Sequence, residues 1–244
     1  METSVPLPLP LEGRRALVTG GARRIGAAIV RALAAAGATV WVHCNRSRAE
    51  AEALLATLGP RAGGLLHADL ASRSACERLY REAMDRSGGI DIWVDNAALF
   101  VPDSAPDADL DRQHEVNLGA PMRFLFQMAA DNVPACVVFL LDARIARPES
   151  ADAPFAGYTL GKRKLASVIG KSAADLAEIR LRLNGIAPGD VLPPEGCRER
   201  ARSVPLGIRP TPDDIARAAV FLAATPSITG QILFLDSGLH LSPS

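Results

Sequence analysis

Tyr158 and Lys162 are the residues whose types and spacing best suit chemistry in this chain. Side chains four positions apart on a helix lie on one face, so the two would be neighbours. An ammonium beside a phenol favours the phenolate and lowers a pKa that is ordinarily about 10. Such a tyrosine can exchange a proton with a carbonyl or an imine at neutral pH. A surface helix could carry the same pair, but lysine is scarce in this chain.

A glycine turn, TGGARRIG at residues 19–26, offers a second kind of chemistry. Glycines between a strand and a helix let the backbone approach a pyrophosphate, and the helix N-terminus favours its negative charge. A tight turn without a ligand would also need glycine, but this turn follows the first predicted strand and opens a helix. We therefore expect Gly20, Arg23, Arg24 and Ile25 to contact a dinucleotide.

The second predicted strand ends in Asn45, Arg46 and Ser47, without the acidic residue that usually grips the ribose of NAD. A carboxylate there would repel a 2′-phosphate, whereas Arg46 and Ser47 would bind one through charge-assisted hydrogen bonds. Arg23 could add to this positive charge. The alternative is a solvated basic loop. This strand end therefore favours NADPH over NADH.

The elements that must position these residues alternate between short apolar strands and amphipathic helices. This pattern predicts a single α/β domain over residues 1–244, a doubly wound (Rossmann) parallel sheet of about seven strands with helices on both faces. Such sheets bind ligands at the carboxyl ends of their strands. Residues 1–12 read as a loose arm, and 189–211 as a candidate substrate lid. The predicted strands are 15–19, 39–44, 64–69, 90–95, 135–141, 179–187 and 231–236, and the predicted helices are 25–36, 49–58, 77–86, one running through 117 towards 128, 155–177 and 212–224.

The composition excludes several classes of function. The formal net charge is zero, which argues against a nucleic-acid-binding protein. No apolar run is long enough to span a bilayer, and the N-terminus lacks the basic start of a signal peptide. The four cysteines are far apart and form no CxxC pair, so we expect reduced thiols, no metal site and a cytoplasmic location.

Four segments together resemble motifs of the short-chain dehydrogenase/reductase family: the glycine turn, DNAA at 95–98, YTLGK at 158–162 and NGIAPG at 184–189. The resemblance extends over nearly the whole chain and implies a homotetramer. It departs from the family where Asp95 and Ala98 replace the usual asparagine and glycine. The further residues that it assigns to the cofactor are Asp69, Leu70, Asn96, Ala97, Ala98, Tyr158, Lys162, Pro188 and Gly189.

The resemblance also implies the roles of single residues. Tyr158 would be the proton donor, and Lys162 would also reach the nicotinamide ribose. Asn117 matches the family asparagine that ties a water to the lysine, although it could simply be a polar helix residue. Asp69 would hold the adenine amino group, a role that rests on the resemblance because a strand-end aspartate is more often a turn former.

Three departures from the general family resemble its pteridine reductase branch. Arg24 replaces the middle glycine of the turn, and Asp142 follows the fifth strand where a serine is usual. Phe100, at the mouth of the cofactor cleft, matches a phenylalanine that stacks the pterin against the nicotinamide. Asp142 is three residues further from Tyr158 than the family spacing, and we place the extra residues in the 147–154 loop. Ser150 is the fallback for a serine role.

These observations predict an NADPH-dependent reductase of a small, pterin-like substrate, a dihydropterin or dihydrofolate-like ring. Asp142, Tyr158, Lys162 and Asn117 would be its catalytic residues, and Arg24, Phe100, Asp142 and Tyr158 would bind the substrate. One alternative is a carbonyl reductase acting on a 3-oxoacyl thioester or a polyketide-like ketone. Another is a cofactor-binding regulator without catalysis, which would need neither Tyr158 nor Lys162.

Overall fold

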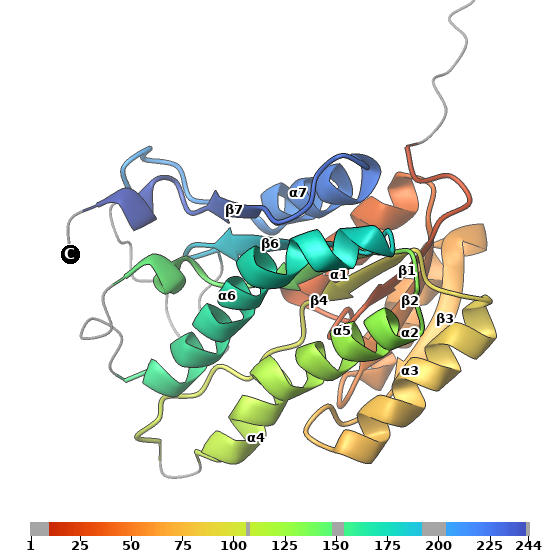
Figure 1. Ribbon diagram of the computed structural model, residues 1–244, viewed down its shortest axis with the longest axis horizontal. Coiled ribbons are helices and arrows are strands. Elements are labelled where there is room, and N and C mark those ends of the chain that lie inside the picture. The colour runs from red at the N-terminus through yellow and green to blue at the C-terminus, as the bar shows by residue number, and fades with distance from the viewer. Residues whose placement is uncertain (1–9, 106–107, 148–153, 192–203, 243–244) are drawn as a thin grey trace, which may run out of the picture.

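The computed structural model describes residues 10–105, 108–147, 154–191 and 204–242. They form one parallel sheet in the order β3-β2-β1-β4-β5-β6-β7, covered by helices on both faces (Figure 1). Every neighbouring pair of strands is parallel. The expected doubly wound sheet is therefore confirmed. Its strands are β1 (Arg15–Val18), β2 (Thr39–Cys44), β3 (Ala62–His67), β4 (Ile92–Asp95), β5 (Cys136–Leu140), β6 (Arg182–Pro188) and β7 (Ile232–Leu235).

The helices bury their apolar residues in two clusters, one on each face of the sheet. α1, α2 and α7 pack against one face, and α3, α5 and α6 pack against the other. The buried strands are apolar on both sides, as a sheet covered on both faces requires. The helices are α1 (Arg24–Ala35), α2 (Arg48–Thr57), α3 (Arg73–Ser87), α4 (Leu110–His114), α5 (Ala120–Ala130), α6 (Ala156–Glu178) and α7 (Pro212–Ala224).

Local sequence sets the helix boundaries. α7 has its predicted bounds because Thr211 and Asp214 form a capping box, each side chain accepting a hydrogen bond from the other residue's backbone N–H. α3 begins one turn earlier than predicted, because the Ser72 hydroxyl accepts a hydrogen bond from the Ala75 N–H and caps the helix there. Between α4 and α5, residues Glu115–Gly119 form a π-helical turn, which the sequence pattern did not predict.

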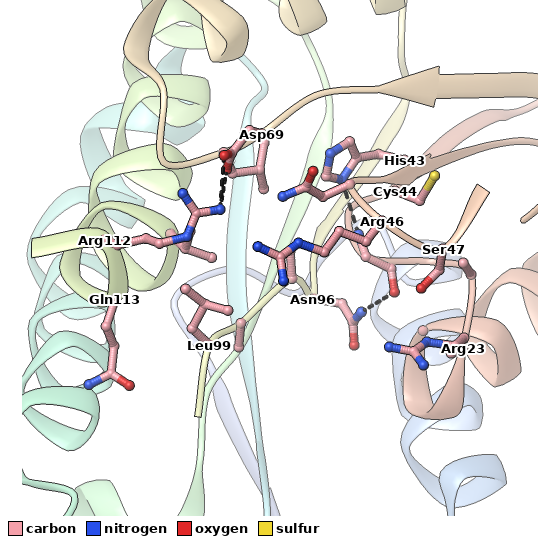
Figure 2. Close-up of a pocket in the computed structure, with 18 of the residues that line it drawn as sticks. Arg23, His43, Cys44, Arg46, Ser47, Asp69, Asn96, Leu99, Arg112 and Gln113 are labelled. Atoms are coloured by element: carbon pink, nitrogen blue, oxygen red, sulfur yellow. Dashed lines mark hydrogen bonds and ion pairs between the residues drawn. The ribbon is translucent and has the colours of Figure 1, made fainter. Parts of the chain in front are cut away.

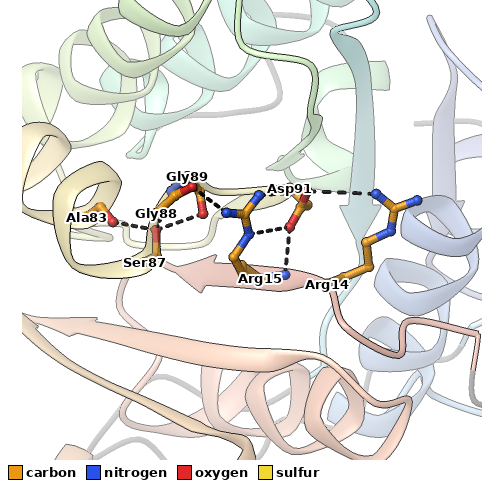
Figure 3. A network of polar contacts seen from close by, with 7 residues as sticks. All are labelled: Arg14, Arg15, Ala83, Ser87, Gly88, Gly89 and Asp91. Atoms are coloured by element: carbon orange, nitrogen blue, oxygen red, sulfur yellow. Dashed lines mark hydrogen bonds and ion pairs between the residues drawn. The ribbon is translucent and has the colours of Figure 1, made fainter.

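An ionic network joins β1 to the segment before β4 at the amino ends of these two strands (Figure 3). Arg15 donates to Asp91 from its backbone N–H at 2.9 Å and from Nε at 2.8 Å. Its guanidinium also binds the carbonyl of Gly88, and Arg14 lies 3.7 Å from the same aspartate. These contacts lie at the opposite end of β1 from the glycine turn, so they serve the fold.

Candidate active site

A cavity of about 630 Å³ opens where the strand order reverses, at the carboxyl ends of β1, β2 and β4. Figure 2 shows Arg46 pointing into it between Arg23 at the glycine turn and Arg112 on α4. The predicted cofactor residues that line this cavity are Gly20, Arg23, Arg24, Ile25, Asn45, Arg46, Ser47, Asp69, Leu70, Asn96, Ala97 and Ala98. Four other predicted residues lie beyond it, Tyr158 and Lys162 on α6 and Pro188 and Gly189 at the end of β6.

The backbone of the glycine turn suits the close approach of a pyrophosphate. Gly20 has a left-handed φ of +60°, and a Cβ there would lie 2.9 Å from the Cα of Ala97. A Cβ on Gly26 would lie 2.3 Å from the carbonyl oxygen of Gly20, so side chains would block the turn. The N-terminus of α1 follows directly, and its free N–H groups favour an anion. The residues present therefore fit a dinucleotide cofactor.

Arg24 keeps the left-handed backbone of the glycine that it replaces. Its φ is +53°, a conformation that costs an L residue about 1 kcal/mol or more. Strain of this kind persists at ligand-facing turns, where the side chain is used. Arg24 lines the cavity, and its expected contact with cofactor and substrate stays a prediction.

His43 holds the glycine turn in place, a role that its position in a strand did not reveal. Its Nδ1 accepts a hydrogen bond from the N–H of Gly20 at 3.1 Å, and its Nε2 lies 3.1 Å from the carbonyl oxygen of Ala68. The imidazole must therefore be neutral, with its proton on Nε2. Burial lowers the pKa of His43 to about 4, which agrees with that assignment.

Asp69 is paired across the cavity with Arg112, which the sequence did not single out. The Arg112 Nη2 donates to both carboxylate oxygens, at 2.9 and 2.8 Å. Burial opposes ionisation of Asp69, but the Ala71 N–H and Arg112 hold its pKa below the ordinary value. Asp69 therefore lines the cavity as a carboxylate, as its expected contact with an adenine amino group requires. Arg112 had no recognisable signal, since it lies on a short helix after an irregular loop.

Asp95, at the end of β4, is buried where the family usually has asparagine. Its Oδ1 accepts hydrogen bonds from Trp93 Nε1 at 3.3 Å and from the Thr19 hydroxyl at 3.5 Å. Its Oδ2 has no hydrogen-bond partner in the part of the chain that the structure describes. Burial raises its pKa to about 7, although Trp93, Lys162 and Thr19 all oppose this shift.

Thr19 and Asn96 tie the two walls of the cavity together. The Thr19 hydroxyl accepts hydrogen bonds from the N–H groups of Asn96 and Ala97, at 3.0 and 3.1 Å. The Asn96 side chain donates to the carbonyl oxygens of Thr19 and Gly20. Asn96 therefore supports the turn in addition to lining the cavity.

Three of the four residues expected at the catalytic centre, Asp142, Tyr158 and Lys162, come together at the end of β5. The Tyr158 hydroxyl donates a hydrogen bond to Asp142 Oδ2 at 3.2 Å. Lys162 Nζ donates to the carbonyl oxygen of Leu140 at 2.6 Å and lies 5.7 Å from the centre of the Tyr158 ring. Asp142 also accepts the N–H of Arg144, which fixes its orientation. The longer spacing between Asp142 and Tyr158 does not separate them.

The protonation of this centre differs from the sequence expectation in one respect. Burial and the Asp142 carboxylate raise the pKa of Tyr158 well above its ordinary value, whereas Lys162 was expected to lower it. The reason is geometric, because the ammonium faces the Leu140 carbonyl and the tyrosine hydroxyl faces a carboxylate. Burial also raises the pKa of Asp142 and lowers that of Lys162 to about 8. Tyr158 thus holds its proton, as a proton donor must.

Asn117 lies in the π-helical turn and is fully buried. Its amide accepts the Leu99 N–H at 2.8 Å and donates to the Leu99 carbonyl at 2.7 Å. It therefore fixes the segment that leads to Phe100, a contact that was not predicted. Its expected role of tying a water to Lys162 stays a prediction.

Phe100 is stacked, but on another residue of the chain. Its ring lies 4.2 Å from that of Phe155 at an interplanar angle of 9°, and it meets the Tyr158 ring edge-on at 4.8 Å. Phe155 was not singled out by the sequence. Phe100 therefore borders Tyr158, with one ring face already in contact with Phe155, and its expected stacking on a pterin stays a prediction.

Several expectations cannot be compared with the structure. The fallback residue Ser150, most of the 189–211 segment, Cys197 and most of the N-terminal arm lie outside the described residues. Cys44, Cys76 and Cys136 are buried free thiols. No described helix is long and apolar enough to cross a membrane. Nor do the described His, Cys, Asp and Glu side chains form a cluster of three or more that could hold a metal ion.

Comparisons with known proteins agree with this geometry. The profile of a family described as enoyl-(acyl carrier protein) reductase matches residues 20–240. The crystal structure of FolM alternative dihydrofolate reductase 1 from Brucella suis, in complex with NADP, is 35% identical with a TM-score of 0.85, covering 96% of this chain and 98% of that one.

Two curated relatives are more distant in sequence. Pteridine reductase 1 from Leishmania tarentolae is 27% identical, covering 93% of this chain and 96% of its own. The 3beta-hydroxysteroid dehydrogenase 1 of Eggerthella lenta is also 27% identical, covering 96% of each chain. The relatives thus include one enzyme named for a pteridine and one named for a hydroxysteroid.

Proposed function

Because the chain belongs to the short-chain dehydrogenase/reductase family and is thus an oxidoreductase with a nicotinamide cofactor, we propose that it uses NADPH to reduce the C=N bond of a dihydropterin or dihydrofolate-like ring. The hydrogen bond from Tyr158 to Asp142 carries this proposal. A serine hydroxyl at position 142 would only bind a carbonyl oxygen, whereas a carboxyl group can also carry a proton. The similarity to pteridine reductase 1 and FolM supports the same substrate class.

The residues of the chain would divide the work as follows. NADPH, held by residues such as Gly20 and Arg46, would supply a hydride to the imine carbon. Tyr158 donates its hydroxyl proton to the imine nitrogen, which takes the electron pair of the broken C=N π bond. Asp142 then takes up a proton from solvent, which its raised pKa favours, and passes it to the Tyr158 phenolate. Lys162 holds a positive charge near the phenolate that forms. Arg24 and Phe100 hold the ring.

The deciding assay follows NADPH oxidation by the purified protein with dihydrobiopterin, dihydromonapterin and dihydrofolate, beside an acetoacetyl thioester. We expect turnover of at least one of the dihydro rings, with a higher kcat/KM than for the thioester. Turnover of the thioester alone would refute the pterin substrate and favour a carbonyl reductase. Cofactor binding without any turnover would favour a regulator.

The preference for NADPH can be tested at Arg46, which points into the cavity beside Ser47 (Figure 2). A charge-assisted hydrogen bond contributes about 1.5–3 kcal/mol, so Arg46→Ala should weaken NADPH binding roughly 10- to 100-fold. NADH lacks the 2′-phosphate, so its affinity should change little. Dissociation constants from nicotinamide fluorescence give both values.

Arg48 provides the matched control for this experiment. It lies two residues further on, pairs with Glu52 on the surface of α2 and does not line the cavity. Arg48→Ala should leave both affinities unchanged. If Arg46→Ala lowered the affinities for NADPH and NADH equally, Arg46 would not be recognising the 2′-phosphate.

We propose a homotetramer in the cytoplasm on the family pattern alone. Analytical ultracentrifugation would measure the oligomeric state directly.

A further inference from the structure

Arg144 is a cation of the catalytic centre to which neither the sequence nor the mechanism has so far given a role. It lies two residues after Asp142 in the short 3-10 turn Ala143–Ala146. Its guanidinium carbon lies 4.8 Å from the centre of the Phe100 ring and 5.1 Å from that of Phe155. It also interacts electrostatically with Asp142 and Tyr158. Arg144 therefore borders the space beside the proton donor and the ring-stacking residue.

The backbone of Arg144 is held firmly in this place. Its N–H donates to Asp142 at 2.9 Å, and its carbonyl accepts the N–H of Arg147 at 3.0 Å. Arg163 on α6 braces the same turn, donating to the carbonyl oxygens of Arg144 and Arg147. These contacts fix the backbone position from which the guanidinium extends.

One nitrogen of the Arg144 guanidinium donates no hydrogen bond to the described residues. Arg144 Nη1 is shielded from solvent and has no hydrogen-bond partner among residues 10–105, 108–147, 154–191 and 204–242. A buried donor left without an acceptor costs about 1–3 kcal/mol, and more when it is charged. Turning this nitrogen towards a bound ligand would therefore break no hydrogen bond at Nη1 and would remove this cost.

We propose that Arg144 reads the substrate by donating a hydrogen bond to a carbonyl oxygen on the ring edge next to the C=N bond. This inference rests on the proposed function. A 2-amino-4-oxo ring carries such an oxygen beside the imine nitrogen that Tyr158 protonates. A flat ring bordered by Phe100 would bring that edge towards both Tyr158 and Arg144. A guanidinium has donors only, so it favours a 4-oxo ring and disfavours a 4-amino ring. Arg144 is thus a specificity-determining residue.

The test compares two ligands of nearly equal shape in the presence of NADP+. One is a 2-amino-4-oxopteridine and the other a 2,4-diaminopteridine. In Arg144→Met, which keeps the length of the side chain but loses its donors, affinity for the 4-oxo ligand should fall roughly 10- to 100-fold. Affinity for the 4-amino ligand should stay the same or rise. Calorimetric titration gives both constants, and their ratio is insensitive to a partial loss of folded protein.

Two further variants complete the test. Arg144→Lys keeps the charge without the planar fork and should recover part of the lost 4-oxo affinity. Arg147→Met alters the next arginine of the same turn and should leave the ratio unchanged.

The outcomes separate this inference from the function on which it rests. If the wild-type protein binds and reduces a dihydropterin but Arg144→Met leaves the ligand ratio unchanged, the role of Arg144 is refuted and the proposed function stands. If the two ligands lose affinity equally, Arg144 is structural and the role is likewise refuted. If the wild-type protein binds neither ligand, the proposed function fails, and this inference fails with it.

Discussion

Replacing Tyr158 by phenylalanine should lower kcat roughly 100- to 10,000-fold while leaving NADPH affinity almost unchanged. General acid catalysis contributes roughly 10²- to 10⁴-fold to a rate, and this variant removes the proposed acid. The ring itself stays, so its edge contact with Phe100 can persist. Single-turnover NADPH oxidation measures the loss in the chemical step, and cofactor fluorescence measures binding.

Tyr80, the only other tyrosine in the chain, is the natural control. Its hydroxyl donates to Asp131 at 2.8 Å, between α3 and the end of α5 and outside the candidate site. Tyr80→Phe should keep a kcat within about twofold of wild type, because no proton of the reaction passes through it. Normal activity in Tyr158→Phe would refute the mechanism, and an equal loss in both variants would point to damage of the fold.

Asp95→Asn should stabilise the protein at pH 8 and change its stability little at pH 4. In the folded protein the pKa of Asp95 is raised to about 7 by burial, against about 3.9 for an exposed aspartate. The folded state therefore binds more protons than the unfolded state between pH 4 and 7. Its stability falls as the pH rises through this window, by roughly 3 kcal/mol. Asparagine has the same shape and no such cost.

Chemical denaturation of both proteins without cofactor, at pH 4 and at pH 8, measures this effect. The comparison must be between the variant and wild type at each pH, because His43 acts in the opposite direction. Its pKa is lowered to about 4 by burial, so its contribution to stability is lost as the pH falls from about 6.5 towards 4. The same stabilisation of Asp95→Asn at both pH values would show that the charge of Asp95 is not its cause.

The same substitution should have a cost in catalysis. Burial lowers the pKa of Lys162 to about 8 even though the carboxylates of Asp142 and Asp95 raise it. Without the Asp95 carboxylate, Lys162 should lose its proton at a lower pH. The alkaline limb of the kcat profile should then shift to lower pH in Asp95→Asn.

The order of the elements could be predicted from the sequence because strand and helix periodicities are local signals. α7 shows this most clearly, since the capping box at Thr211 and Pro212 marks its start. The π-helical turn around Asn117 could not be predicted, because no local sequence signal marks it, and the Asn117 side chain bonds there to the backbone of Leu99, which is distant in sequence. The start of α3 was missed because Ser72 lies in a run of several possible caps.

Some residues of the candidate site could likewise be predicted from the sequence, and others could not. Residues that stand in contiguous motifs, such as the glycine turn and the Tyr158–Lys162 pair, can be found by spacing. Motif spacing could not identify Arg112, His43 or Arg144. Their contacts join segments that are far apart in the sequence, or depend on the direction of a side chain. Asp142 was located by the end of its strand and linked to Tyr158 by the resemblance to pteridine reductases, and the structure brings the two into hydrogen-bond contact.

The left-handed backbone of Arg24 has a consequence for how this protein would respond to selection. Glycine relieves the strain at this position, so a screen for heat resistance should enrich Arg24→Gly. A screen for turnover should keep arginine, because the guanidinium would be needed at the cavity. The identity of residue 24 in an evolved library would therefore report which of the two pressures acted on it.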